Sequence, residues 1–184
     1  MRRIFAFLFI TLCTCLSAIP AKASKLSDEG AAYKRDLIKA IKQADKIVVT
    51  EHSDQYDFFE VKTHTFQQQE QLVYQTVILS PQDVVNFKRL VKAVPDRTQY
   101  VSAACIFVAH HTIKFYAQDE LLSTLPICFK CGAQEWDGTK HAPPQEIVGG
   151  LRKFITAIGL HPEMKWRQLA DERLKKDGLP SGSD

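Results

Sequence analysis

Apolar residues recur at intervals of three and four over four stretches of the chain, and this spacing predicts helices. The stretches cover residues 28–44, 80–94, 144–159 and 162–178. The second has the clearest start. Ser80 is a capping residue, Pro81 suits the first helical position, and Asp83 lies in the first turn near the positive end of the helix dipole.

Runs of β-branched and aromatic residues between these helices predict about six strands. They lie at residues 47–50, 56–66, 72–79, 101–109, 112–117 and 121–129. We expect the second and third to pair as a hairpin, and the last two to pair across a turn at residues 118–120. The order α-βββ-α-βββ-α-α, with antiparallel strands and helices on one side, predicts a single α+β domain over residues 24–178. Residues 179–184 are expected to form a flexible tail.

The first 23 residues have the three parts of a secretory signal peptide. Arg2 and Arg3 precede an apolar run at residues 4–16, and Ala21 and Ala23 form a small-x-small cleavage site. The apolar run is shorter than the ~20 residues of a membrane-spanning helix. We therefore expect a cleaved leader and an exported protein, periplasmic or secreted, that has no membrane association after cleavage.

Loss of this leader changes the charge of the protein. The whole chain has a formal net charge of +3, and the leader contains Arg2, Arg3 and Lys22 but no acidic residue. The mature chain is therefore close to neutral. Nucleic-acid binders have a basic surface, and so do proteins that bind anionic membranes, so neither class of partner is expected.

Three cysteines remain in the mature chain, namely Cys105, Cys128 and Cys131. In an oxidising compartment an odd number of this kind predicts one disulfide and one free or liganded thiol. The sequence leaves the pairing open. Cys128 and Cys131 can pair only if their strand breaks, because residues three apart on a continuous strand point to opposite faces.

The same cysteines permit two alternatives. The turn at residues 118–120 brings His110 or His111 opposite Cys128, so these histidines with Cys128 and Cys131, and with Cys105 as an added ligand, predict a zinc or copper site. The Cys-x-x-Cys spacing also predicts a thiol–disulfide redox protein, although the residues that follow it do not have a helical pattern. No other cofactor is expected.

A second polar cluster contains Glu51, His52, Asp54 and Asp57. Such residues can bind a cation, but a run of this kind is more often a solvated turn, and we predict a solvated turn here. The pair Gly149-Gly150 falls inside an apolar helix and predicts close helix packing, because the chain contains no phosphate-loop motif. A Gly-x-Ser-x-Gly nucleophile motif is also absent from the sequence.

Residues 105–131 carry a pattern of the form Cys-x-Phe, His-His-x-Ile and Ile-Cys-Phe-x-Cys. In this pattern the chain resembles small exported bacterial proteins of unassigned function. The resemblance implies a shared scaffold and brings no activity with it. From secretion, small size and the absence of a catalytic motif we expect a non-enzymatic protein that is stabilised by a disulfide and binds a protein or a small molecule.

Overall fold

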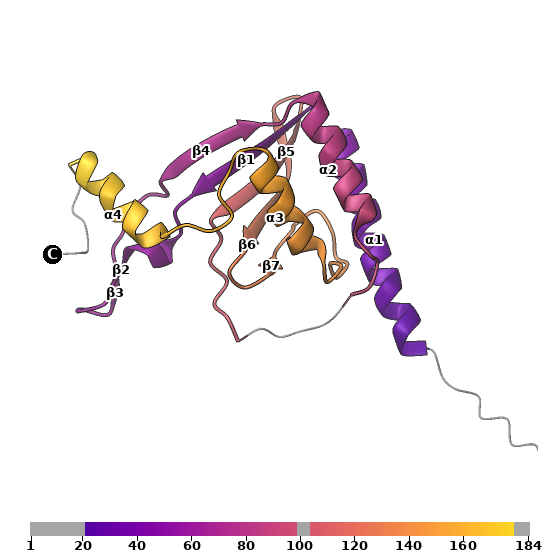
Figure 1. Cartoon of the computed structure of the whole chain (residues 1–184), viewed down its shortest axis with the longest axis horizontal. Coiled ribbons are helices and arrows are strands. Elements are labelled where there is room, and N and C mark those ends of the chain that lie inside the picture. The colour runs from indigo at the N-terminus through magenta and orange to yellow at the C-terminus, as the bar shows by residue number, and fades with distance from the viewer. Residues whose placement is uncertain (1–20, 99–103, 179–184) are drawn as a thin grey trace, which may run out of the picture.

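A five-stranded antiparallel sheet forms the centre of the molecule in the computed structural model, which describes residues 21–98 and 104–178 (Figure 1). Its strands, in the order in which they lie side by side, are β4 (Val73–Ile78), β1 (Lys46–His52), β5 (His111–Ala117), β6 (Glu120–Cys128) and β7 (Ala133–Gln134). A separate pair consists of β2 (Phe59–Glu60) and β3 (Thr65–Phe66). The predicted α+β class with an antiparallel sheet is therefore confirmed.

Three helices share one hydrophobic core with the sheet. They are α1 (Ala21–Gln43), α2 (Pro81–Ala93) and α3 (Ile147–Ala157). Every second residue of the central strands faces this core, as Val49, Ile113 and Leu125 do, and each of these side chains is fully buried. Phe87 of α2 and Phe154 of α3 stack with their ring centroids 4.7 Å apart. The apolar residues that alternate along the strands and those that recur every three or four positions in the helices therefore pack into one core.

The start of α2 follows the sequence signals closely. The Ser80 side chain accepts a hydrogen bond from the Asp83 backbone N–H, and the Asp83 carboxylate accepts one from the Ser80 backbone N–H. This reciprocal capping box satisfies two backbone donors that a helix N-terminus otherwise leaves unpaired. The predicted helix from Ser80 to Pro95 is confirmed, with its last helical residue at Ala93.

The fourth helix, α4 (Trp166–Lys176), lies apart from the other three, beside the short 3₁₀ helix η1 (Gln55–Phe58) (Figure 1). Phe58, Ala170 and Leu174 form a small second core with Leu72. The sequence predicted that this helix begins at Pro162, but residues 162–165 are not helical. Since α4 packs at one end of the sheet, it forms a wall there and does not cover the sheet face.

The hairpin between β5 and β6 is confirmed, with a turn shorter than predicted. Ala117 pairs with Glu120, so only Gln118 and Asp119 lie in the loop, and both have positive φ angles of 52° and 66°. Two left-handed residues are typical of the tight turn that matches the twist of a two-stranded ribbon. A bulge between Phe115 and Tyr116 then shifts the register, so that His111 lies opposite Ile127.

Two predicted strands are wrong. Residues 56–66 form η1, β2 and β3 with a turn between them, and the predicted hairpin with residues 72–79 does not form, because β4 pairs with β1. Asp54 and Asp57 form a capping box that favours a helical turn over an extended strand. Residues 104–109 have no strand partner either, and residues 99–103 lie outside the described part of the chain.

Most of the predicted leader and the predicted tail at residues 179–184 also lie outside the described residues. Within the described ranges 21–98 and 104–178, no helix has both the length and the apolar character that crossing a membrane requires.

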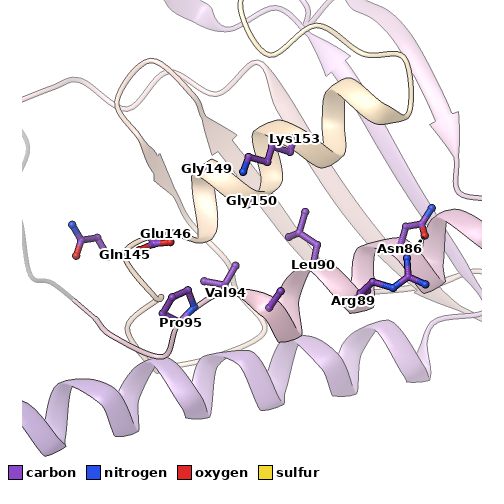
Figure 2. Close-up of a pocket in the computed structure, with 11 residues that line it drawn as sticks. Asn86, Arg89, Leu90, Val94, Pro95, Gln145, Glu146, Gly149, Gly150 and Lys153 are labelled. Atoms are coloured by element: carbon purple, nitrogen blue, oxygen red, sulfur yellow. Dashed lines mark hydrogen bonds between the residues drawn. The ribbon is translucent and has the colours of Figure 1, made fainter.

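A groove with a cavity volume of about 610 Å³ separates part of α2 from part of α3 (Figure 2). Leu90 of α2 and Val94, which follows α2, lie on one side of it, and Gly149 and Gly150 of α3 lie on the other. A Cβ atom on Gly150 would come within 3.0 Å of Leu90 Cδ2, whereas one on Gly149 would meet nothing within 4 Å. The prediction of close helix packing therefore holds for Gly150, and Gly149 faces open space.

This difference gives a matched pair of variants. Gly149→Ala is expected to raise the free energy of unfolding by about 0.5 kcal/mol, because alanine loses less backbone entropy on folding and its Cβ meets no neighbour. Gly150→Ala is expected to gain less or to destabilise, because Leu90 must move. Urea unfolding of both variants beside the parent protein measures the difference. Equal gains would contradict the packing described here.

Candidate functional site

A pocket of about 670 Å³ opens at the end of the sheet where β5 begins and β6 ends. We call it the histidine pocket. The segment before β5, the end of β6, η1 and the start of α4 all contribute side chains to it. Its principal residues are Asp57, His110, His111, Cys128, Phe129 and Trp166.

His110 is held in the pocket from two directions. Its Nε2 atom lies 3.2 Å and 3.1 Å from the two carboxylate oxygens of Asp57, and its ring stacks on Trp166 with centroids 4.4 Å apart and planes 8° apart. Asp57 is itself fixed, since its Oδ2 accepts a hydrogen bond of 2.8 Å from the Asp54 backbone N–H. A carboxylate at Nε2 keeps the proton of a neutral imidazole on that atom and leaves Nδ1 as an acceptor.

His111 is fully buried and lies beside a second carboxylate. Its Nε2 atom is 3.5 Å from Glu51 Oε2, which is longer than a normal hydrogen bond, and neither ring nitrogen has a hydrogen-bond partner. The ring makes edge contacts with Phe129 and Trp166, at centroid distances of 5.1 Å and 5.7 Å. His111 therefore forms part of the pocket wall, with Nδ1 unpaired and with Glu51 as the nearest partner of Nε2.

Glu51 is buried as well and interacts with a further histidine. Its Oε2 atom accepts a 2.8 Å hydrogen bond from the His161 backbone N–H and lies 3.5 Å from His161 Nδ1. Burial by itself raises the pKa of Glu51. The His111 ring and the His161 backbone N–H, together with the charges of both histidines, outweigh burial and hold that pKa below its ordinary value. Glu51 is thus kept as a buried anion.

His52 adds a second buried imidazole next to these groups. Its Nδ1 atom is 2.9 Å from the Ser53 carbonyl oxygen, and its Nε2 atom is 2.8 Å from Thr112 Oγ1. Burial, and then the proximity of His110 and His111, lowers the pKa of His52, although the Ser53 carbonyl acts in the opposite direction. The structure therefore favours the neutral form of this side chain.

The three cysteines in the described residues form one disulfide and one free thiol, as the count predicted. Cys105 is bonded to Cys131 with their Cα atoms 5.9 Å apart, and this settles the pairing that the sequence left open. Cys128 is a free thiol and only 1% exposed. Its sulfur accepts a 3.3 Å hydrogen bond from the Cys131 backbone N–H. The disulfide fastens the segment before β5 to the end of β6, and so it holds one wall of the histidine pocket.

The residues of the predicted metal site are only partly brought together. His110, His111 and Cys128 line one pocket, and the β5–β6 pairing ends at His111 and Ile127, one step before the position at which Cys128 would face His110. Cys131 is held in the disulfide. Among the described residues, no group of three or more His, Cys, Asp or Glu side chains is placed to hold a metal ion. The zinc or copper site stays a prediction of the sequence alone.

The redox alternative also stays a prediction. It requires Cys128 and Cys131 to act as a pair, whereas Cys131 is bonded to Cys105 here. A reactive thiol of this kind is usually exposed in an electropositive environment, and Cys128 is buried.

The solvated turn predicted at Glu51, His52, Asp54 and Asp57 is wrong for most of its members. Glu51, His52 and Asp57 are only 3%, 4% and 6% exposed, and Asp54 is partly buried. The sequence does contain a signal for this. Glu51 continues the alternation of Ile47 and Val49, which face the core, so the pleat of β1 places its carboxylate on the buried face.

Comparison with known protein families, with curated proteins and with solved structures finds no match to this chain.

Proposed function

We propose that this chain is an exported, non-enzymatic binding protein, and that the histidine pocket takes a small organic ligand. The observation that carries the proposal is the fully buried His111, which lines the pocket with no hydrogen-bond partner at Nδ1 and with Glu51 Oε2 at 3.5 Å from Nε2. An unpaired buried polar group costs about 1–3 kcal/mol. Native proteins satisfy nearly all such groups, so a ligand that pairs with His111 would recover part of this cost.

The polar groups of the pocket favour a ligand that donates hydrogen bonds. Asp57 lies at Nε2 of His110 and Glu51 lies nearest to Nε2 of His111, so in the neutral rings both Nδ1 atoms are acceptors. A hydroxyl or an amine group can donate to them. The pocket is also lined by two basic residues, Lys130 and Arg167, and by two acidic residues, Asp57 and Glu163, so these charges balance and favour a ligand without net charge. A neutral hydroxylated molecule fits both conditions.

The remaining walls favour an aromatic or apolar body. Val108, Phe129 and Met164 line the pocket together with Trp166. Pockets for small molecules combine walls of this kind with a few well-placed polar groups, and their volumes are of this order. We therefore assign the ligand to the class of small phenols and related hydroxylated aromatic molecules.

Two features favour binding over catalysis, and one favours export. The Cys128 sulfur is buried against the Cys131 backbone N–H, so the free thiol is shielded. The Asp57 carboxylate and the Trp166 ring immobilise His110. The Cys105–Cys131 disulfide is of the kind that persists outside the cytoplasm, in agreement with the predicted leader.

The test uses 4-ethylphenol as the probe and 4-ethylanisole, which has no hydroxyl donor, as its control. A Trp136→Phe variant leaves Trp166 as the single tryptophan, so that its fluorescence reports on the pocket. We expect 4-ethylphenol to change this fluorescence at saturation and to bind about tenfold more tightly than 4-ethylanisole, because only the phenol can donate to a histidine.

The histidine itself is tested with His111→Phe, which keeps an aromatic ring and removes both nitrogens. We expect this variant to lose the preference for the phenol, with both probes binding about equally. His141→Phe is the matched control, because His141 interacts with Glu29 of α1 and does not line the pocket. Equal affinity for the two probes in the parent protein, or no binding of either, would refute the proposed ligand class.

A further inference from the structure

The groove between α2 and α3 is a second cavity, separate from the histidine pocket (Figure 2). Among the described residues, none lines both cavities. The floor of the groove is apolar, since the two glycines of α3 line it together with Leu90, Ala93, Val94 and Pro95. Its volume of about 610 Å³ lies within the range of sites for small molecules.

Gly149 keeps this groove open at a cost to its own helix. It occupies an exposed position in the first turn of α3, where alanine would stabilise the helix more than glycine does. The described structure does not require a glycine there, because its φ is not positive and a Cβ atom would meet nothing within 4 Å. The missing side chain instead leaves space in the groove, and so it matters for what occupies the groove.

Two basic side chains border the groove without an acidic partner. Arg89 of α2 and Lys153 of α3 are exposed, and neither forms an ion pair with another residue of the described ranges. The acidic residue that lines the groove, Glu146, lies at the end away from Arg89 (Figure 2). Because the Gln145 backbone N–H donates to the Arg97 carbonyl oxygen, α3 begins beside the end of α2 and runs back along it. Lys153 therefore lies farther from the acidic end and closer to Arg89.

We propose that this groove binds a free fatty acid of medium chain length. Its carboxylate pairs with Arg89 and Lys153, and its chain lies along the apolar floor toward Val94. Glu146 repels a carboxylate at the other end, so the charges of the groove favour this one orientation. From Asn86 to Val94 the α2 segment rises by ~12 Å, which is the length of an extended acyl chain of about ten carbons.

The size of the groove favours this ligand over a protein partner. Stable protein interfaces involve about 20–30 residues on each side, whereas 11 residues line the groove. A single acyl chain needs only a narrow apolar floor and one charged contact, and the groove supplies both. The proposal does not depend on the ligand of the histidine pocket, because the two cavities have different walls.

Decanoate is the probe, and decyltrimethylammonium, which has a chain of the same length and the opposite charge, is its control. Each is titrated below its micelle concentration into isotopically labelled protein while the amide NMR signals are followed. We expect decanoate to shift the Gly149 and Gly150 amide signals in a saturable way and to bind about tenfold more tightly than the cation. A shift of the Trp166 indole N–H signal without any shift at the glycines would assign decanoate to the histidine pocket and overturn the proposal.

Two variants test the floor and the charges of the groove separately. Gly149→Leu adds a side chain where a Cβ atom meets no neighbour, so it is expected to fold and to bind decanoate at least about tenfold more weakly. The double variant Arg89→Gln with Lys153→Gln removes two exposed charges and is expected to lose most of the preference for decanoate over the cation. Lys92→Gln, at an exposed position of α2 outside the groove, is the matched control and should bind as the parent protein does.

His111→Phe separates this proposal from that for the histidine pocket, because it changes only the pocket and should bind decanoate as the parent protein does. The dispersion of the amide signals shows that each variant is folded. Unchanged decanoate affinity in Gly149→Leu, an unchanged preference in the double variant, or equal affinity of the parent protein for the two probes overturns the proposal. The absence of a saturable shift at Gly149 and Gly150 overturns it as well.

Discussion

Replacing Cys105 and Cys131 together with serine is expected to lower the free energy of unfolding by about 3.5 kcal/mol. The bond joins residues 26 apart in the sequence, and closing a loop of that length removes much of the conformational freedom of the unfolded chain. Urea unfolding of protein produced under oxidising conditions measures the loss as a lower midpoint with little change in slope.

Reduction supplies the control for this variant. A reductant should bring the parent protein down to the stability of the double serine variant, and it should leave that variant unchanged. Counting thiols in the denatured, oxidised parent protein should give one thiol within residues 24–178, from Cys128. If the double variant unfolds at the same urea concentration as the parent, or if three thiols react, the disulfide is not formed in the folded protein.

Loss of the disulfide is also expected to affect the histidine pocket. Cys105, Ile106 and Val108 form one of its walls, yet their segment belongs to no strand in the described part of the chain. The bond to Cys131 and the contact of the Cys131 sulfur with the Ile106 carbonyl oxygen fasten it to the end of β6. The disulfide therefore holds this segment beside β6, as backbone hydrogen bonds hold the strands of the sheet together.

The parts of this fold that the sequence predicted well are those with local causes. The apolar face of α2 and its capping box depend only on residues in that helix and at its start. The β5–β6 hairpin depends on a short turn between two neighbouring strands. The partner of β4 was predicted wrongly because adjacent strands usually pair, whereas η1 and its capping box interrupt the chain before β4. Pairing of β4 with β1 depends on distant contacts that no local pattern encodes.

The candidate site could be predicted only in part for a similar reason. The sequence singled out His110, His111 and Cys128, and the structure places all three at one pocket. It did not connect them with Asp57 or Trp166, which come from elements about fifty residues away on either side of His110 in the sequence. Side chains that meet across such separations are joined by the fold, and neither spacing nor composition reports on them.

Replacing Glu51 with glutamine is expected to lower the free energy of unfolding at pH 7 by about 1.5–3 kcal/mol, because a buried carboxylate loses a charge-assisted hydrogen bond and its attraction to two histidines. The pKa of Glu51 lies below its ordinary value of 4.5 in the folded protein. Its contribution is therefore fully present above pH 4.5 and is lost as the pH falls through the folded pKa. The parent protein and the variant should converge in stability as the solution is acidified.

Two features separate this effect from general acid sensitivity. His52, whose pKa is lowered by burial, makes both proteins less stable as the pH falls below about 6.5, so it does not contribute to the difference between them. Glu163→Gln is the matched control, since Glu163 is exposed and its ion pair with Arg152 should contribute less than about 1 kcal/mol. Urea unfolding from pH 3 to pH 8 measures all three proteins. A constant difference between the parent protein and Glu51→Gln across this range would show that packing, and not the buried charge, accounts for the role of Glu51.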